Sequence, residues 1–221
     1  MSRVVWDQIG EKEYETGVDR GMLYPQADGG TYPMGVAWNG ISAVSESPSG
    51  AEASPVWADN QKYLNLIGVE EYAGSIEAYM SPPEFDECDG SLEIAPGVYA
   101  GQQNRRAFGL AYRTLLGNDT KQNSYGYKLH LVYGCTAAPT SKDYSTVNDS
   151  PEPIALSWEF STIPVNVPGG KPTACLTINS TKTTPEKLKA LEDILYGTED
   201  ADPRLPLPEE VISIMGEAAA G

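Results

Sequence analysis

The stretch Tyr125-Gly-Tyr-Lys-Leu-His-Leu-Val-Tyr133 alternates along its length and decides the fold class of the chain. Successive side chains of a strand point to opposite faces, so its odd positions form one apolar face. That face consists of Tyr127, Leu129, Leu131 and Tyr133. We therefore expect a strand that covers a core, paired with a second strand at residues 106–115 across a protruding hairpin loop at 116–124.

Other strands are expected before and after this pair. Asn39-Gly40 is the strongest two-residue hairpin signal that a sequence offers, so residues 34–38 and 41–44 are expected to pair. Four more strands are expected at residues 63–67, 72–79, 155–161 and 172–178, with a turn near Gly68 between the first two. The 22 glycines, 17 prolines and 13 tyrosines are typical of short strands and many turns.

Two helices are expected, at residues 81–90 and 185–195, each with a capping box and proline near its start and a glycine at its end. The capping pairs are Ser81 with Glu84 and Thr183 with Glu186, and the glycines are Gly90 and Gly197. The second helix carries an apolar stripe of Leu188, Leu191, Ile194 and Leu195. This stripe predicts that the second helix lies against a sheet.

Two segments read as extensions of the core. Residues 45–59 are too polar and too rich in proline and glycine to be core, and they predict a long loop. Within this loop, Trp57 either begins the next strand or docks onto another molecule. Residues 198–221 predict an extended C-terminal arm after a domain at 1–197, with a candidate docking element at 211–215 and a loose end at 218–221.

Acidic residues outnumber basic ones by 31 to 15, which gives a net charge of −16. Such a charge keeps copies apart unless their contacts are specific, and it repels polyanions. Residues 101–150 are nevertheless net basic, and they include Arg105, Arg106, Arg113 and Lys121. We expect these cations to pair with acidic surface of the same chain or of a neighbouring copy, because they fall far short of a nucleic-acid-binding face.

Catalytic motifs are not apparent in the sequence. The one histidine, His130, falls on the polar face of its strand, so we expect a sheet-surface residue rather than an acid or base. Cys88, Cys135 and Cys175 are widely spaced and are expected to be reduced thiols, not a disulfide or a metal site. Residues 85–90 lack the ligand pattern of a calcium loop. The expectation is a non-enzymatic protein with no cofactor, metal or catalytic residue.

Targeting signals are also not apparent. The first ten residues lack the apolar centre of a signal peptide. No apolar run approaches the about 20 residues that a membrane-spanning helix needs. The sequence thus predicts synthesis in a cytoplasm and no membrane partner.

A set of collinear motifs resembles the major tail proteins of long-tailed bacteriophages. The motifs extend from about Gly35 to Glu210 in the family's order. They include Trp38-Asn-Gly40, Asp59-Asn-Gln-Lys-Tyr-Leu64, Ile76-Glu-Ala-Tyr79, Pro83-Glu-Phe-Asp-Glu-Cys-Asp-Gly90, Phe108-Gly-Leu-Ala-Tyr-Arg-Thr114, Gly117-Asn-Asp119, Tyr125 to Gly134, Asn148-Asp-Ser-Pro-Glu152 and Leu191-Glu-Asp-Ile-Leu-Tyr-Gly197. Ile163 departs from the family, which more often has a threonine there.

The resemblance implies a structural virion protein with a mainly β fold, a sandwich of two antiparallel sheets with a flanking α-helix. It implies a homohexameric ring, and rings that stack into a hollow tail tube. The partners would be other copies of the chain, a tape-measure protein, and tail initiator and terminator proteins. Viral DNA would pass through the tube without specific binding. Such a protein is made in the cytoplasm of the host bacterium and resides in the tail of the virion.

Candidate contact residues follow from the resemblance taken together with the predicted loop and the basic stretch. The loop at 45–59 is a natural device for reaching the next ring, through Ser47, Pro48, Pro55, Val56 and Trp57. The basic residues Arg105, Arg106, Arg113 and Lys121 are candidates for contacts between subunits. An acidic tube lumen would let DNA slide without adhering to the wall.

Two alternatives remain open from the sequence. The first is another non-enzymatic virion β-sandwich, such as a tail terminator or a capsid-decoration protein. The second is a hydrolase built on a sandwich, against which the lack of a nucleophile–base motif argues.

Overall fold

The structure is a computed structural model that describes residues 3–147, 149 and 152–216. Its strands are β1 (Glu13–Pro25), β2 (Val36–Ala37), β3 (Ile41–Glu46), β4 (Ser49–Gly50), β5 (Ala53–Ala58), β6 (Gln61–Ile67), β7 (Glu70–Glu71), β8 (Ala73–Ala78), β9 (Leu92–Ala95), β10 (Val98–Ala100), β11 (Phe108–Asn118), β12 (Gln122–Ala137), β13 (Leu156–Thr162) and β14 (Cys175–Asn179). Its helices are α1 (Asp86–Asp89), α2 (Pro185–Tyr196) and α3 (Pro208–Met215), with 3-10 turns at Pro83–Phe85 and Ser180–Lys182. The expected mainly β fold is confirmed.

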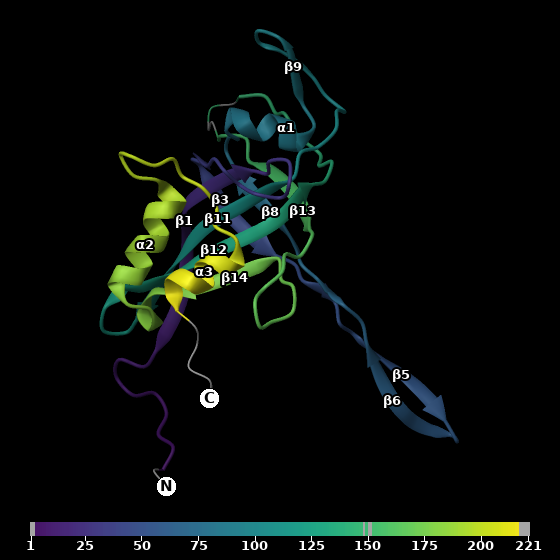
Figure 1. Cartoon of the computed structure of the whole chain (residues 1–221), viewed down its shortest axis with the longest axis vertical. Helices are drawn as coiled ribbons and strands as arrows, with labels where there is room; N and C mark the ends of the chain where they lie inside the picture. Colours follow the sequence, from purple (N-terminus) through teal and green to yellow (C-terminus); the bar gives the residue numbers. More distant parts are fainter. Residues whose placement is uncertain (1–2, 148, 150–151, 217–221) are drawn as a thin grey trace.

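One continuous antiparallel sheet supplies both layers of the sandwich, because the long strand β12 belongs to each of them. Its first part lies between β11 and β14, in the order β2-β1-β11-β12-β14. Its last residues, from Cys135 on, pair instead with β13, which continues to β8 and β3. Figure 1 shows the sheet at the centre of the molecule, with α2 and α3 along one side.

Gly134 lies where β12 changes partner. Its φ is +61°, in the left-handed region that favours glycine. A Cβ at this position would lie 2.3 Å from the carbonyl oxygen of Ile163, which makes any side chain a clash with backbone. The Ile163 N–H donates to the Gly134 carbonyl at 3.0 Å, so the close approach of the two strands is itself bonded.

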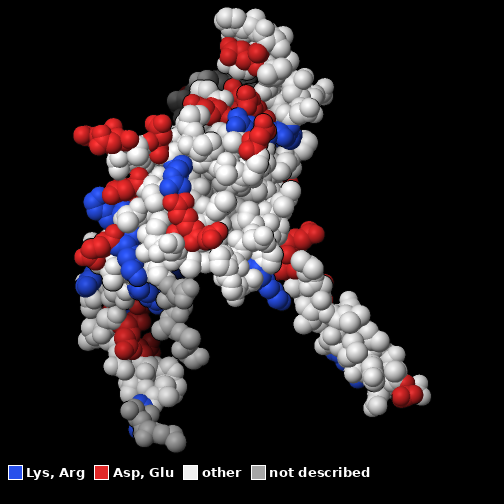
Figure 2. Space-filling view, in the orientation of Figure 1, with Lys and Arg blue, Asp and Glu red and all other residues white. Residues whose placement is uncertain are grey.

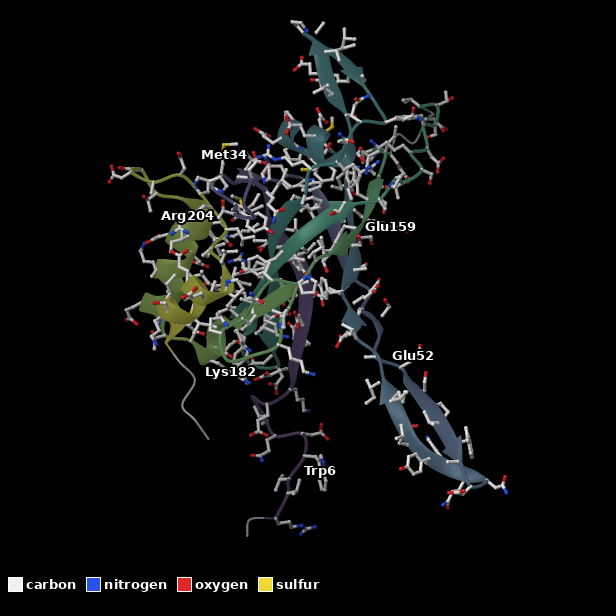
Figure 3. All side chains as sticks on the ribbon, turned by 45° about the vertical axis from the view of Figure 1, so that its right-hand side comes forward. Trp6, Met34, Glu52, Glu159, Lys182 and Arg204 are labelled. Atoms are coloured by element: carbon white, nitrogen blue, oxygen red, sulfur yellow. The ribbon has the colours of Figure 1, made fainter. Side chains whose placement is uncertain are left out.

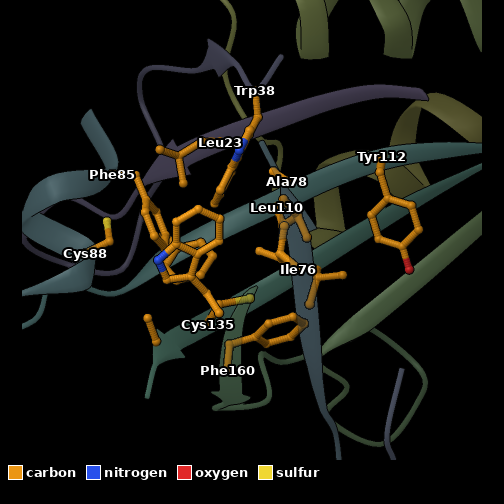
Figure 4. Close-up of a cluster of buried hydrophobic side chains, with 14 residues drawn as sticks. Leu23, Trp38, Ile76, Ala78, Phe85, Cys88, Leu110, Tyr112, Cys135 and Phe160 are labelled. Atoms are coloured by element: carbon orange, nitrogen blue, oxygen red, sulfur yellow. The ribbon is translucent and has the colours of Figure 1, made fainter. Parts of the chain in front are cut away.

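Two clusters of buried side chains lie on the two faces of the sheet. Between the layers lie aromatic and aliphatic side chains that include Trp38, Phe85 and Trp158, whose rings contact one another edge-on or tilted. Figure 4 shows this cluster, with Trp38 and Phe85 labelled. On the outer face lie Leu129, Leu131 and Tyr133, packed against Leu188, Leu191 and Leu195 of α2. The expected burial of the α2 stripe against a sheet is confirmed, except that Ile194 is only partly buried.

Tyrosine hydroxyl groups fasten the helical layer to the sheet. Tyr24 donates to the carbonyl of Leu195 at 2.7 Å, and Tyr133 donates to the carbonyl of Pro206 at 2.9 Å. Burial raises the pKa of both tyrosines, so both stay neutral hydrogen-bond donors at ordinary pH.

The predicted pairing of β11 with β12 is confirmed, but the loop between them is shorter than expected. Both strands extend into the predicted loop, and Asn118 pairs with Gln122. The Asn118 side chain closes this turn by accepting from the backbone N–H of Lys121 at 2.6 Å. The turn formers at 116–124 thus belong mostly to strand ends.

The predicted hairpin at Asn39-Gly40 is wrong, although a turn is present there. β2 pairs with β1, and β3 pairs with β8, so the turn joins two different layers. The burial of Trp38 between the layers directs the chain across, and its indole N–H donates to the Met80 carbonyl at 2.9 Å. Likewise β6 and β8 are present near residues 63–79 but do not pair with each other.

The expected helices are present, but neither capping box forms. The first is a 3-10 turn followed by α1, and Gly90 ends it in the left-handed conformation as expected. Neither its N-cap nor Thr184, the N-cap of α2, accepts a side-chain cap hydrogen bond. Thr183 instead donates to the carbonyl of Asn179 at 3.0 Å, because the preceding 3-10 turn brings that carbonyl within reach.

The segment after residue 197 is not an extended arm. Leu205 and Val211 are buried, and the Leu205 N–H donates to the Tyr32 carbonyl at 3.2 Å. The apolar residues at 211–215 belong to α3, which covers the outer face of the same sheet beside α2. These apolar side chains therefore pack within the same subunit. The loose end expected at 218–221 and parts of the motif at 148–152 lie outside the described residues.

Replacement of Gly134 by alanine is expected to destabilise the fold, because alanine adopts the left-handed conformation poorly and its Cβ meets backbone. The free energy of unfolding should fall by at least about 2 kcal/mol in urea titrations. Gly101→Ala is the matched control, since no atom of the described residues lies within 4 Å of a Cβ there. Equal stability of the two variants would contradict this role of Gly134.

Removal of the Glu210 charge is expected to lower the free energy of unfolding only at pH values at which the carboxyl group is ionised. Arg204 donates two hydrogen bonds to this carboxylate, at 2.7 and 2.6 Å, and they hold the pKa of Glu210 below its usual value. A depressed carboxyl pKa contributes stability above the unfolded pKa of about 4.3, and this contribution is lost as the pH falls through the folded pKa.

In urea titrations, Glu210→Gln should therefore lose less than about 1 kcal/mol at neutral pH, because the pair is partly exposed. Once the carboxyl group is protonated, the variant and the original chain should be equally stable. If Glu210→Gln lost the same free energy of unfolding at neutral pH and at a pH low enough to protonate the carboxyl group, the ion-pair explanation would be contradicted.

Candidate assembly surface

A β-hairpin projects far from the body of the subunit, and residues 49–71 that form it are called the arm here (Figure 1). At its base, β4 pairs with β7. Further out, β5 pairs with β6. The prediction of a long loop at 45–59 is therefore wrong. Ser45 and Glu46 end β3, and most of the remaining residues form the outgoing strand of the arm.

The tip of the arm is a two-residue turn that suits its sequence. Asp59 and Asn60 have φ values of +52° and +62°, the conformation of a type I′ hairpin turn. Ala58 and Gln61 pair on either side of this turn. Asp-Asn between two apolar runs is a signal from which the hairpin was predictable, but the proline and glycine content of residues 45–59 outweighed it.

Apolar side chains cover both faces of the arm. Trp57, Tyr63 and Ile67 are 66%, 69% and 71% exposed. Leu64 and Leu66 alternate with Tyr63 and Ile67 along β6 and therefore point to the opposite face. Side chains stand on either side of the ribbon in Figure 3. A soluble hairpin normally buries one face, so this arm has apolar surface on both sides and no cover from its own body.

Few charged residues lie on the arm between residues 51 and 69. They are Glu52, Asp59 and Lys62, and Figure 2 shows this part of the molecule almost free of red and blue. The net charge of −16 is thus carried elsewhere. The arm is a surface on which another molecule can approach without strong charge repulsion.

The predicted loop contacts fall at two levels of the arm. Ser47 and Pro48 are exposed just before its base, where the Ser47 N–H donates to the Ala73 carbonyl at 2.8 Å. Pro55, Val56 and Trp57 lie on β5, with a bulge after Val56. Trp57 begins no new strand; it is an exposed residue near the end of β5. The residues that sequence reasoning missed are those of the returning strand, above all Tyr63 and Ile67.

The three arginines of the basic stretch pair with acids of their own chain. Arg105 lies 3.5 Å from Asp89, and Arg106 lies 3.0 Å from Glu87. Arg113 makes a bidentate pair with Asp19, at 2.6 and 2.5 Å, and stacks on the Tyr127 ring.

Lys121 is exposed at the β11–β12 turn, with its amine 5.9 Å from the centre of the Tyr125 ring. Pairing with the chain's own acidic surface is therefore observed for the arginines. A contact of these four residues with a neighbouring subunit stays a prediction.

Two further segments expose apolar side chains. The hairpin of β9 and β10 projects at the opposite end from the arm, and it exposes Leu92, Ile94, Val98 and Tyr99. The segment before β1 exposes Val4, Val5, Trp6 and Ile9, and Trp6 is labelled in Figure 3. Neither segment carries a clear sequence signal, because each is short and flanked by polar residues.

His130 is not a sheet-surface residue. It is 8% exposed and stacks on Tyr112, with ring centres 4.6 Å apart. The polar face of β12 faces the second layer at this point, which a single strand's alternation does not reveal. Cys88 and Cys135 are buried and Cys175 is partly buried, all three as free thiols.

Comparisons with known proteins add no family. Neither a scan against protein-family models nor a search of curated proteins finds a match. Among the described residues, no helix is both long enough and apolar enough to span a membrane.

Removal of the arm is expected to leave the body folded, because its projecting part adds no residue to either buried cluster. In the variant, Asn-Gly replaces residues 51–69 and joins the paired residues Gly50 and Glu70 by a two-residue turn. Its thermal midpoint should match that of the full chain within about 2 °C. Loss of cooperative unfolding, followed by circular dichroism, would show that the arm is part of the folding unit.

Proposed function

We propose that this chain is a structural subunit that polymerises with copies of itself, as the tube subunit of a long-tailed bacteriophage. The observation that carries the proposal is the arm, apolar on both faces and uncovered by its own body. The motif resemblance supplies the specific assembly, a stack of hexameric rings. The net charge of −16 adds selectivity, since it opposes every contact between copies that is not specific.

The energetics of the arm favour many contacts over one. Burial of a large apolar side chain contributes about 1.5–3 kcal/mol. Covering Trp57, Tyr63, Leu64, Leu66, Ile67 and Val69 would thus contribute on the order of 10 kcal/mol. Association alone costs about 4–15 kcal/mol in lost freedom. One arm therefore binds weakly, whereas two stacked rings joined by one arm from each subunit are held by many contacts at once.

The geometry of the arm suits a head-to-tail contact. It projects from one side of the body, so it can reach a surface of the next copy that lies away from that copy's own arm. Heterologous contacts of this kind close into rings or continue as tubes. The outer edges of β5 and β6 also offer unpaired backbone groups to a neighbouring strand.

In this proposal the remaining partners follow from the family. A tape-measure protein fills the tube during assembly, initiator and terminator proteins cover its ends, and DNA passes through without specific binding. The subunit is made in the host cytoplasm and works in the virion tail. No catalytic step is assigned to it.

The test combines electron microscopy with sedimentation velocity on the purified chain. The variant Trp57→Ser/Ile67→Ser removes two large apolar side chains from one face of the arm. We expect the original chain to form tubes and this variant to remain dispersed, with an unchanged thermal midpoint. The matched control is Ile163→Ser, which changes an isoleucine on the body with the same 71% exposure as Ile67.

The outcomes separate the alternatives. Stacked rings that disappear only in the arm variant support a tube subunit. Single rings would favour a terminator. Tubes from the arm variant would contradict the role of the arm, and a monomer that degrades glycans would contradict a structural function altogether.

A further inference from the structure

Three side chains of different chemistry meet next to the base of the arm, at a place called its root here. Glu46 is the last residue of β3, His130 lies in the middle of β12, and Cys175 is the first residue of β14. One donor atom of each, a carboxylate oxygen, a ring nitrogen and a sulfur, lies within 4.8 Å of the other two. Oxygen, nitrogen and sulfur donors in this combination are those that zinc binds.

The hydrogen bonds around His130 settle which ring nitrogen carries the proton. Glu15 forms an ion pair with Lys128, so its carboxylate only accepts hydrogen bonds. The Thr114 hydroxyl donates its single proton to Glu15, and therefore Thr114 accepts from Nε2 of His130, 2.9 Å away. The proton lies on Nε2, and Nδ1 presents a lone pair.

That lone pair faces other electron-rich atoms. Nδ1 of His130 is buried and has no hydrogen-bond partner among the described residues, and it lies 3.5 Å from Oε1 of Glu46. The same oxygen accepts from the Tyr112 hydroxyl at 2.6 Å, which fixes its position. With the ring proton on Nε2, the imidazole offers no proton to Glu46. A buried lone pair opposite a carboxylate is unfavourable unless a cation lies between them.

We propose that Glu46, His130 and Cys175 bind a zinc ion at the root of the arm. The Cys175 thiol loses its proton to solvent on binding and becomes a thiolate ligand. Zinc bonds of about 2.0–2.3 Å place donor atoms roughly 3.5 Å apart. Nδ1 of His130 and Oε1 of Glu46 already have this separation, so only the Cys175 sulfur moves closer, by about 1 Å or less. Water or the Tyr72 hydroxyl completes the tetrahedron. This hydroxyl is buried beside Cys175 and has no hydrogen-bond partner within the described part of the chain.

The position of the site gives the ion a role. Glu46 lies three residues before the arm begins, and Tyr72 directly follows its end. His130 and Cys175 belong to the other layer of the sandwich. A bound zinc ion therefore ties the arm's root to the rigid centre of the sheet and fixes the direction in which the arm projects. This role rests on the proposed function of the arm, whereas the site itself does not.

The test uses the full chain, freed of metal by a chelator and kept dispersed at low concentration. Calorimetric titration with zinc should show one ion per chain. Titration with cobalt should give thiolate-to-metal charge-transfer absorption. Cys175→Ser should abolish this absorption, and Glu46→Gln, at an exposed position, should weaken binding at least about tenfold without affecting folding.

Cys88→Ser is the matched control, because it removes a buried thiol that lies outside the site. It should bind zinc like the original chain. Absence of zinc binding, a cobalt spectrum without thiolate absorption, or equal loss in Cys88→Ser would overturn the proposal. Because binding is measured on dispersed subunits, failure to form tubes would leave the zinc result intact, and loss of zinc binding would leave tube formation to be judged separately.

Discussion

The fold depends on one strand that serves two layers. β12 pairs with β14 before Gly134 and with β13 after it, so the sandwich is a single sheet folded on itself. The constraint at Gly134 is steric, because only a residue without a Cβ fits against the Ile163 backbone. Both buried clusters, the docking of α2 and the placement of Glu46 opposite His130 follow from this change of partner.

The buried core and the exposed apolar surface lie in different parts of the chain. The body buries its aromatic side chains between the layers and under α2 and α3. The arm leaves comparable side chains in solvent, and an isolated two-stranded hairpin is marginal in water. Burial of the arm's apolar side chains is therefore not used to stabilise the body, and it can stabilise a contact with another molecule. The acidic surface elsewhere limits which contacts form.

Local patterns predicted the elements better than their partners. Three patterns were sufficient to predict β12 and α2, because each depends on residues close in sequence. They are the alternation in β12, the apolar stripe of α2 and the glycine that follows α2. The hairpin at Asn39-Gly40 failed because the burial of Trp38 directs the chain into the other layer. Residues 45–59 were predicted as a long loop, and the pairing of β5 with β6 in the arm was missed.

The sequence by itself determined the β-rich composition, the charge, the main hairpin and the helix that covers it. Only the tertiary structure decided that residues 198–216 pack onto the sheet, that the basic arginines pair within the chain, and that Glu46, His130 and Cys175 meet. These three residues are separated by long stretches of chain and lie in different layers. No local pattern encodes their meeting, because it depends on where β12 exchanges one neighbour for another.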